Sequence, residues 1–477
     1  MKGAYRLERE INRIALINAP IDTKYQDSTS LFCPPLGLMS IKAYLEQKNE
    51  QFEVLLLDGM ILTTKEIIRK MTEFHPDAVG VSIQLLSYKN ALKICHEASH
   101  QSSFVFVGGH HATQMANKII TNQHSYINCV VCGDGEEAIY RICSGEKPEK
   151  VPGTVCWDSY KEKAYATKPN LCNLDILPNP YSAKNIDYTP YIKNLRKSSF
   201  SQKNGKYYRI YSHKGCRFRA DGKRCVFCGR ADEGYRFFSI ERYFQYLDEM
   251  GVTANDFVFD VGDDLSGNII WLQEAVNHIH KESKTMPKIG IFGRGDEITY
   301  ESASLLQHFG VVDVTMGVES GDNSVLISSG KEIDGSDIFY KAARTLFENG
   351  IGLTPSYVLG LPGENQRSLH NTIKHARILK DLSLSILGDP PGEIVANLLE
   401  PIPGSNAFKI LEKEFPHKYL NEDKLELETM QRDYFCTVFS LDAAKYKLFR
   451  AEMGKAGKII NNLAAFADPQ GWLNNEL

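Results

Sequence analysis

The sequence has 477 residues, of which 43% are hydrophobic and 24% are charged, and its formal net charge is −4. This length predicts more than one domain, and the composition is that of a globular protein rather than a disordered one. Because the charges nearly balance, nothing indicates a polyanionic partner, and we expect no nucleic acid ligand.

No apolar run approaches the roughly 20 residues that a membrane span needs, and the first residues lack the pattern of a signal peptide. We therefore expect a cytoplasmic protein with no membrane partner. Its eleven cysteines are then expected to be reduced, so clustered cysteines are better candidates for metal ligands than for disulfides.

Residues 1–150 alternate short apolar runs with helical patterns and are predicted to form the first domain. Continuous apolar strands separated by helices indicate a parallel sheet covered on both faces, the doubly wound α/β arrangement of Rossmann- and flavodoxin-like domains. The strand candidates are RIALIN (13–18), FEVLLLD (52–58), AVGVSIQ (78–84), FVFVGG (104–109) and CVVCGDG (129–135).

The carboxyl ends of these predicted strands carry small and polar residues. Ligands of doubly wound sheets lie beyond those ends, and glycines there let a large flat ligand approach the backbone closely. The residues are Asp58, Gly59, Ser82, Gly108, Gly109, Gly133, Asp134 and Gly135. The pattern predicts a ligand site at this edge of the sheet.

Residues 151–205 are rich in proline and are predicted to be an irregular connector. A second βα series follows in residues 206–404, and its six units predict an incomplete, TIM-like (β/α)6 barrel with its site at the C-terminal strand ends. Residues 405–477 are predicted to form a helix-rich C-terminal region. The strand candidates of the second series are YYRIYSH (207–213), FVFDVGD (257–263), KIGIFGR (288–294), VVDVTMGVES (311–320), LTPSYVLG (353–360) and GEIVANLLE (392–400).

Three cysteines, Cys216, Cys225 and Cys228, come directly after the first predicted strand of this second series. Three thiolates on one loop suit a soft metal centre. A four-iron cluster held by three cysteines leaves one iron without a protein ligand, where a substrate can bind. From the local pattern alone, structural zinc with His213 as fourth ligand is an equal alternative. The position at the active face of a βα barrel favours the cluster.

The order of several motifs along residues 13–405 resembles the cobalamin-binding branch of the radical S-adenosylmethionine (SAM) superfamily. The motifs are PPLGLMSIKAYL, VGVSIQ, VFVGGHHAT and VVCGDGEEAI in the first part, and C-V-F-C, VTMGVESGDNSVL, YVLGLPGE and LEPIPGS in the second. The resemblance implies a [4Fe–4S] cluster on Cys216, Cys225 and Cys228, SAM at the open iron, and cobalamin on the N-terminal domain.

The resemblance also implies contacts with the two organic cofactors. The cobalamin contacts would be Ser82, Gln84, Gly108, Gly109, His111, Gly133, Gly135 and Glu136. The SAM contacts would be Phe227, Asp263, Arg294, Glu319, Gly360 and Leu361. Ordinary strand-to-helix turns are the alternative for the glycine-containing segments, and a salt bridge at the barrel rim is the alternative for Arg294.

The sequence departs from the family pattern in three places. Eight residues separate Cys216 from Cys225, where three are commonest, and the basic residues of this insertion are expected to be solvated. Gly262-Asp263-Asp264 stands where Gly-Gly-Glu is frequent. No D-x-H-x-x-G follows the first strand, so no histidine lower ligand to cobalt is expected. The basic residues are Arg217, Arg219, Lys223 and Arg224.

The resemblance implies reductive cleavage of SAM to a 5′-deoxyadenosyl radical and a methyl group delivered from methylcobalamin. The predicted function is a C-methyltransferase acting on an unactivated carbon of a small molecule or peptide, with flavodoxin or ferredoxin as electron donor. The alternatives are a cyclisation, rearrangement or oxidation with the same cofactors and, from a different class, a non-catalytic cobalamin or iron–sulfur sensor.

Overall fold

The computed structural model describes residues 10–22, 33–101, 103–168, 171–195, 205–331, 333, 335–419 and 425–464. The chain divides into two compact units. Unit 1 comprises the described residues within Met1–Ser201, Gly229–Glu233 and Ile402–Leu427, and unit 2 those within Gln202–Cys228, Gly234–Pro401 and Glu428–Leu477. Within the described residues no helix is both long and apolar enough to cross a membrane.

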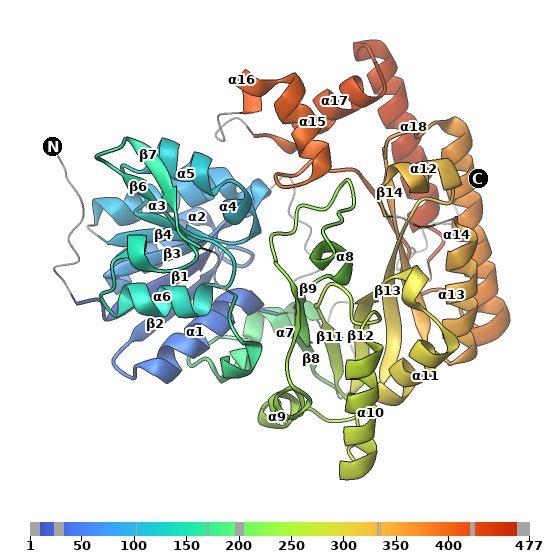
Figure 1. Ribbon diagram of the computed structural model, residues 1–477, viewed down its shortest axis with the longest axis horizontal. Coiled ribbons are helices and arrows are strands. Elements are labelled where there is room, and N and C mark those ends of the chain that lie inside the picture. Colours follow the sequence, from blue (N-terminus) through green and yellow to red (C-terminus); the bar gives the residue numbers. More distant parts are fainter. Residues whose placement is uncertain are drawn as a thin grey trace. The chain divides into compact units, whose positions relative to one another are not determined.

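Unit 1 is built on a seven-stranded sheet with the order β2-β1-β3-β4-β5-β6-β7 (Figure 1). The first five strands pair in parallel, as predicted, and the last two pair antiparallel. The strands are β1 (Arg13–Asn18), β2 (Glu53–Asp58), β3 (Ala78–Ser82), β4 (Phe104–Gly108), β5 (Cys129–Val131), β6 (Thr154–Asp158) and β7 (Lys163–Ala166).

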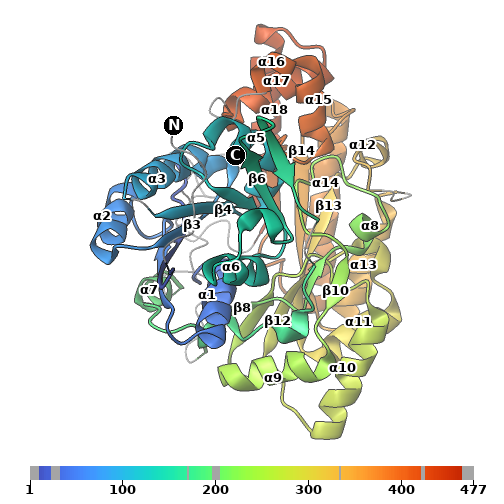
Figure 2. The ribbon, with the colours of Figure 1, turned by 60° about the vertical axis from the view of Figure 1, so that its left-hand side comes forward.

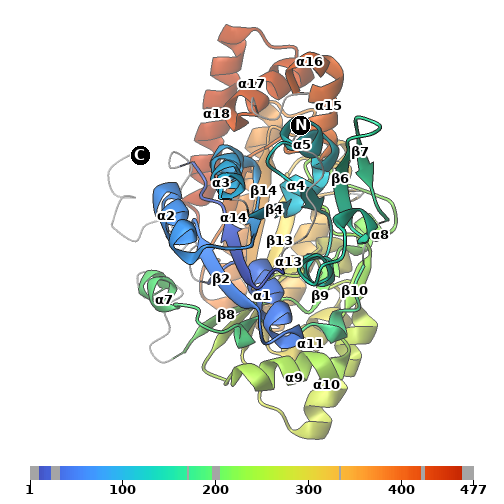
Figure 3. The ribbon, with the colours of Figure 1, turned by 90° about the vertical axis from the view of Figure 1, so that its left-hand side faces the viewer.

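Helices cover both faces of this sheet because the strand order reverses direction after β2. Right-handed crossovers then place α1 and α6 on one face and α2 and α3 on the other. Each of these pairs packs together (α1 and α6 in Figure 2, α2 and α3 in Figure 3). The helices of unit 1 are α1 (Leu36–Lys48), α2 (Thr64–Phe74), α3 (Tyr88–His100), α4 (His110–Gln114), α5 (Ala116–Gln123), α6 (Gly135–Cys143), α7 (Thr189–Leu195), α15 (Asn406–Glu414) and α16 (Pro416–Tyr419).

Strands β6 and β7 lie in the segment that the sequence predicted to be an irregular connector. Each has only four or five residues, and β7 is largely exposed, so its sequence has little of the apolar character that marks a strand. Pairing with the edge of β5 supplies the stability that the local sequence lacks.

Unit 2 contains a six-stranded parallel sheet with the order β15-β14-β13-β12-β11-β8 (Figure 2). This open sheet, covered by helices, is the predicted half-barrel. Its strands are β8 (Tyr207–Ile210), β11 (Phe257–Asp260), β12 (Lys288–Gly293), β13 (Val311–Glu319), β14 (Gly352–Leu359) and β15 (Val395–Leu398), and a separate antiparallel pair is formed by β9 (His213–Gly215) and β10 (Tyr235–Phe237).

The helices of unit 2 begin where the sequence places polar capping residues. The side chains of Asn268, Thr299 and Asn365 each accept a backbone N–H in the first turn of α10, α11 and α14, which satisfies donors that a helix start otherwise leaves unpaired. The helices are α8 (Arg217–Ala220), α9 (Ile240–Met250), α10 (Ile269–Glu282), α11 (Tyr300–Phe309), α12 (Asn323–Ser328), α13 (Asp337–Glu348), α14 (Gln366–Leu387), α17 (Leu427–Val438) and α18 (Ala443–Asn461).

The C-terminal helices α17 and α18 cover the β15 end of this sheet. The Asn461 side chain accepts a hydrogen bond from the Ala396 amide at 2.6 Å, and the Gln431 side chain donates to the Leu399 carbonyl at 3.1 Å. These contacts satisfy backbone groups that an edge strand would otherwise expose.

Candidate functional site

The three cysteines of the predicted metal site lie on one loop of unit 2, beyond the carboxyl end of β8. Cys216 follows β9 directly, and Cys225 and Cys228 come after the short helix α8. All three thiols are free and half-buried. The loop is fixed against the segment after α12, because the Val226 amide donates to the Ser329 carbonyl at 2.8 Å. The fold thus places three soft ligands at the C-terminal face of the half-barrel.

His213 is not available as a fourth metal ligand. Its ring is 1% exposed, its Nδ1 hydrogen-bonds with the Ser212 hydroxyl at 2.9 Å, and its Nε2 accepts from the Asp264 amide at 3.0 Å. The ring also stacks on Phe237 with 4.6 Å between centroids. Both nitrogens therefore have partners inside the protein.

The cysteine thiols also lack the spacing of a structural zinc site. Zinc–sulfur bonds of about 2.3 Å in a tetrahedron place sulfur ligands roughly 4 Å apart. Within the described residues, the group of metal-binding side chains whose ligand atoms all lie within 4.8 Å of one another is Asp134, Glu136 and Cys172. The three cysteine thiols are not such a group, so at least one pair of their sulfur atoms lies more than 4.8 Å apart.

Charges of both signs lie near Cys225. Burial raises the pKa of its thiol to about 11, the nearby Lys331 ammonium and Arg294 guanidinium lower it, and the Glu319 carboxylate and Cys228 thiol raise it. A thiol must lose its proton to bind a metal, and these two cations favour the thiolate.

Arg219 corrects the expectation that the basic residues of the insertion are all solvated. Its side chain is 8% exposed, and its Nη2 lies 2.6 Å from Oδ2 of Asp263. Its Nη1 lies 3.8 Å from Sγ of Cys228. Arg217 and Lys223 are exposed, as expected, whereas Arg224 is half-buried and donates to the Cys228 carbonyl at 3.4 Å. Asp263, predicted to contact SAM, is thus engaged by a residue of the insertion.

Arg294 takes the rim salt bridge that the sequence left open as an alternative. Its guanidinium pairs with both carboxylate oxygens of Asp296, at 3.1 and 2.9 Å. It also donates to the Lys331 carbonyl at 3.1 Å and lies over the Phe218 ring at 4.5 Å. The predicted contact of Arg294 with the SAM carboxylate stays a prediction.

Glu319 ends β13 in a left-handed conformation, with φ +64°, which is uncommon for a non-glycine residue. Its buried carboxylate pairs with the Lys331 ammonium at 3.0 Å, and Lys331 also donates to the Gly317 carbonyl. This buried ion pair holds Glu319 at the strand end where the sequence predicts a SAM contact. Lys331 carried no signal in the sequence that set it apart from other lysines.

The remaining predicted SAM residues lie on two loops of unit 2. Phe227 is half-buried on the cysteine loop. Gly360 has φ +92°, and a Cβ there would lie 2.4 Å from the Phe435 ring. Leu361 is fully buried. Glycine at this position therefore leaves room for the Phe435 ring of α17. The predicted contact of this turn with adenine stays a prediction.

The eight residues predicted to contact cobalamin all lie at the carboxyl edge of the unit 1 sheet. Ser82 and Gly108 end β3 and β4, and Gly135 begins α6. Gly109 has φ +95°, and a Cβ there would lie 3.2 Å from the Ser82 hydroxyl. Gln84 and Gly133 are exposed in the loops between these elements.

His111 and Glu136 point into unit 1. His111 is 6% exposed, and burial lowers its pKa to about 4, so the imidazole is neutral. No hydrogen bond from the described residues reaches its Nε2. The buried Glu136 carboxylate accepts from the Ser40 hydroxyl at 2.7 Å, which joins α6 to α1.

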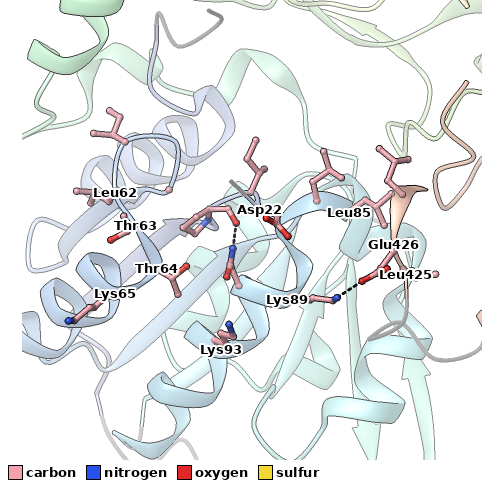
Figure 4. Close-up of a pocket in the computed structure, with 17 residues that line it drawn as sticks. Asp22, Leu62, Thr63, Thr64, Lys65, Leu85, Lys89, Lys93, Leu425 and Glu426 are labelled. Atoms are coloured by element: carbon pink, nitrogen blue, oxygen red, sulfur yellow. Dashed lines mark hydrogen bonds and ion pairs between the residues drawn. The ribbon is translucent and has the colours of Figure 1, made fainter. Parts of the chain in front are cut away.

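A pocket of about 610 Å³ lies beyond the ends of β1, β2 and β3 in unit 1 (Figure 4). Its wall combines apolar side chains with lysines, among them Leu85, Leu86, Lys65, Lys89 and Lys93. Lys89 pairs with Glu426 at 2.9 Å. None of the eight residues predicted for cobalamin lines this pocket, although Gln84 precedes Leu85 directly. Sequence reasoning missed it because its residues come from four separate segments.

Comparison with known proteins gives matches to both units. The model of the B12 binding domain family matches residues 26–142. An uncharacterized methyltransferase of Pyrococcus horikoshii is 23% identical over 397 residues, which are 78% of this chain and 79% of the relative. The hopanoid C-3 methylase of Methylococcus capsulatus is 25% identical over 130 residues, 25% of this chain and 24% of the relative.

Two solved structures share the fold. The radical S-adenosylmethionine methyltransferase TsrM from Kitasatospora setae, with cobalamin and a [4Fe-4S] cluster bound, has a TM-score of 0.63 at 16% identity, covering 84% of this chain and 75% of TsrM. The cobalamin-dependent S-adenosylmethionine radical enzyme OxsB has a TM-score of 0.64 at 15% identity, covering 94% of this chain and 72% of OxsB.

The buried Glu364, in the turn after β14, predicts a pH-dependent stability. Burial raises its pKa from 4.5 to about 7, while hydrogen bonds from the Ser368 hydroxyl and Gly360 amide lower it. A carboxyl with a raised folded-state pKa stabilises the fold fully below its unfolded pKa. As pH rises through the folded-state pKa this contribution is lost, and the free energy of unfolding falls by up to about 3 kcal/mol.

The glutamine of Glu364→Gln does not titrate, so this variant should not lose that contribution. From pH 5 to pH 8 its free energy of unfolding should therefore rise relative to that of the parent. Urea unfolding at both pH values measures the difference. The exposed Glu348→Gln in α13 is the matched control. If the Glu364→Gln and parent profiles run parallel across this range, the carboxyl does not titrate there.

Proposed function

We propose that this chain, which carries a B12-binding domain and shares the fold of the cobalamin-dependent radical SAM enzymes, is itself such an enzyme and transfers a methyl group to an unactivated carbon. The observation that carries the proposal is the cysteine loop: three half-buried thiols at the C-terminal face of a half-barrel, with His213 excluded as a fourth ligand. The substrate class is a small molecule or a peptide.

In this proposal Cys216, Cys225 and Cys228 hold a [4Fe–4S] cluster. When bound, a reduced cluster supplies the electron that cleaves SAM, and cobalamin supplies the methyl group. The protein's own residues position and enclose these groups. Cys225 lies near Lys331 and Arg294, whose charges favour its thiolate, and the buried Glu319–Lys331 pair fixes the end of β13 beside the cysteine loop. The proposed electron donor is a flavodoxin or ferredoxin.

Methyl transfer is favoured over cyclisation or rearrangement by one finding, the similarity to a relative named a methyltransferase across most of both chains.

In unit 1, ligands of a doubly wound sheet lie at the point where the strand order reverses, here beyond β1 and β3. The pocket with Leu86 and its lysines opens at that point. We therefore assign the edge of the corrin to this pocket and its nucleotide side to the loops after β4 and β5.

The first test is an anaerobic reconstitution with iron, sulfide and hydroxocobalamin, followed by a dithionite-driven assay. We expect the parent protein to form 5′-deoxyadenosine from SAM, and labelled methyl from SAM to appear on the bound corrin with S-adenosylhomocysteine. A Cys225→Ala/Cys228→Ala variant should form no 5′-deoxyadenosine, because two of three cluster ligands are removed.

The matched control is Cys436→Ala, which removes a half-buried cysteine of α17 and should keep both activities. Cleavage of SAM without labelling of the corrin would favour a rearrangement or oxidation. A protein that binds corrin and iron but leaves SAM intact would support the sensor alternative and contradict the proposal.

A second test concerns the pocket of unit 1. Leu86→Glu places a carboxylate in the wall where the corrin edge is proposed to bind, and covering that carboxylate with an apolar ligand edge costs at least about 1.4 kcal/mol. We expect at least a tenfold loss of cobalamin affinity in equilibrium dialysis, with iron content unchanged. Ile176→Glu, at an exposed position of unit 1 outside the pocket, is the control. Equal affinity in both variants would exclude the pocket from the corrin site.

A further inference from the structure

The first four residues of the eight-residue insertion between Cys216 and Cys225 form one turn of helix, α8. Helix α8 begins directly after Cys216, and the Ala220 amide donates to the Cys216 carbonyl at 2.9 Å. The turn then ends at Gly222, whose φ of +79° reverses the chain. Residues three apart on a helix share a face, so Arg219 lies on the same face as Cys216.

Arg219 is more buried than the exposed Arg217 and Lys223, since its side chain is 8% exposed. Arg224 is half-buried as well, but its Nη1 donates to the Cys228 carbonyl at 3.4 Å rather than to a thiol. The Arg219 guanidinium joins two groups on opposite sides: Nη2 lies 2.6 Å from Oδ2 of Asp263, and Nη1 lies 3.8 Å from Sγ of Cys228. The guanidinium therefore lies between a strand-end carboxylate and one of the three thiols.

Asp263 is itself held in place. The next residue, Asp264, donates its amide to the buried His213 ring at 3.0 Å, and its carbonyl accepts from the Tyr235 hydroxyl at 2.7 Å. Gly262 packs against the same ring, since a Cβ there would lie 2.2 Å from His213 Cε1. The carboxylate that anchors Arg219 thus sits on a rigid turn.

We propose that Arg219 is a positioning residue that raises the reduction potential of the cluster held by Cys216, Cys225 and Cys228. The inference rests on the proposed function. A fixed positive charge with an N–H directed at a ligand sulfur stabilises the more negative, reduced state of the cluster, since net charge and hydrogen bonds to the sulfurs set such potentials. Asp263 has an anchoring role here, different from the SAM contact predicted from the sequence.

The guanidinium is charged at every accessible pH. Burial lowers the pKa of Arg219, but the ion pair with Asp263 and the nearby thiols raise it by more. The effect on the cluster therefore does not depend on protonation of the arginine. It depends only on the charge and on its placement by Asp263.

The test is an EPR-monitored redox titration of the reconstituted full chain, in which dithionite supplies the single electron that each cluster accepts. We expect Arg219→Gln to make reduction roughly tenfold less favourable, a shift of about 59 mV to lower potential for one electron. Arg219→Lys keeps the charge and should recover most of the shift. Arg217→Gln, two residues away and exposed, should leave the potential unchanged.

Iron and sulfide content separate failure of this inference from failure of the proposed function. If the parent protein holds no cluster, the proposed function fails. If parent, Arg219→Gln and Arg217→Gln hold equal clusters with the same potential, only the role of Arg219 is overturned. Where Arg219→Gln does not retain its cluster, Arg219→Met keeps the aliphatic stem without the charge, and a parent-like potential in that variant overturns the inference equally.

Discussion

The arrangement of unit 2 depends on one buried side chain, His213. Its two ring nitrogens hydrogen-bond Ser212 and the Asp264 amide, so the imidazole ties the start of the cysteine loop to the turn after β11. Gly262 is required at that turn because any side chain would overlap the ring. A residue that the sequence offered as a metal ligand is instead the connection that places the thiols above the sheet.

A second feature of the site is that each cation near the cysteine loop has an acidic partner. Three cationic side chains, those of Arg219, Arg294 and Lys331, surround the cysteine loop, and each pairs with a carboxylate. The partners come from successive positions along the sheet: Asp263 after β11, Asp296 after β12 and Glu319 at the end of β13. A buried charge is costly unless it is paired, so the pairs let positive charge face the sulfurs while the rim stays nearly neutral.

Much of the fold was predictable because buried parallel strands are continuous apolar runs. RIALIN became β1 without a change of bounds, and the fold class of both parts was confirmed. Strands β6, β7 and β10 were missed because they are short and gain their stability from pairing with neighbouring strands, which the local sequence does not reveal.

The details of the site were less predictable, for reasons that are physical. Phe435 fills the space at Gly360 from 75 residues further along the chain, a contact that a turn motif cannot reveal. The position of Arg219, three residues after Cys216, was a usable signal. It places both residues on one face only if the segment is helical, which the sequence did not predict. The partners of Asp263 and Arg294 depend on rotamers and burial, and a motif specifies neither.

The proposed function requires that Cys216, Cys225 and Cys228 bind an iron–sulfur cluster with one iron left open. Mössbauer spectroscopy of protein reconstituted with ⁵⁷Fe, recorded before and after SAM is added, tests this most directly. We expect a four-iron cluster in which one iron changes its signal on addition of SAM, and loss of that cluster when the cysteines are replaced. A protein that takes up zinc in place of iron, or a cluster whose irons all ignore SAM, would contradict it.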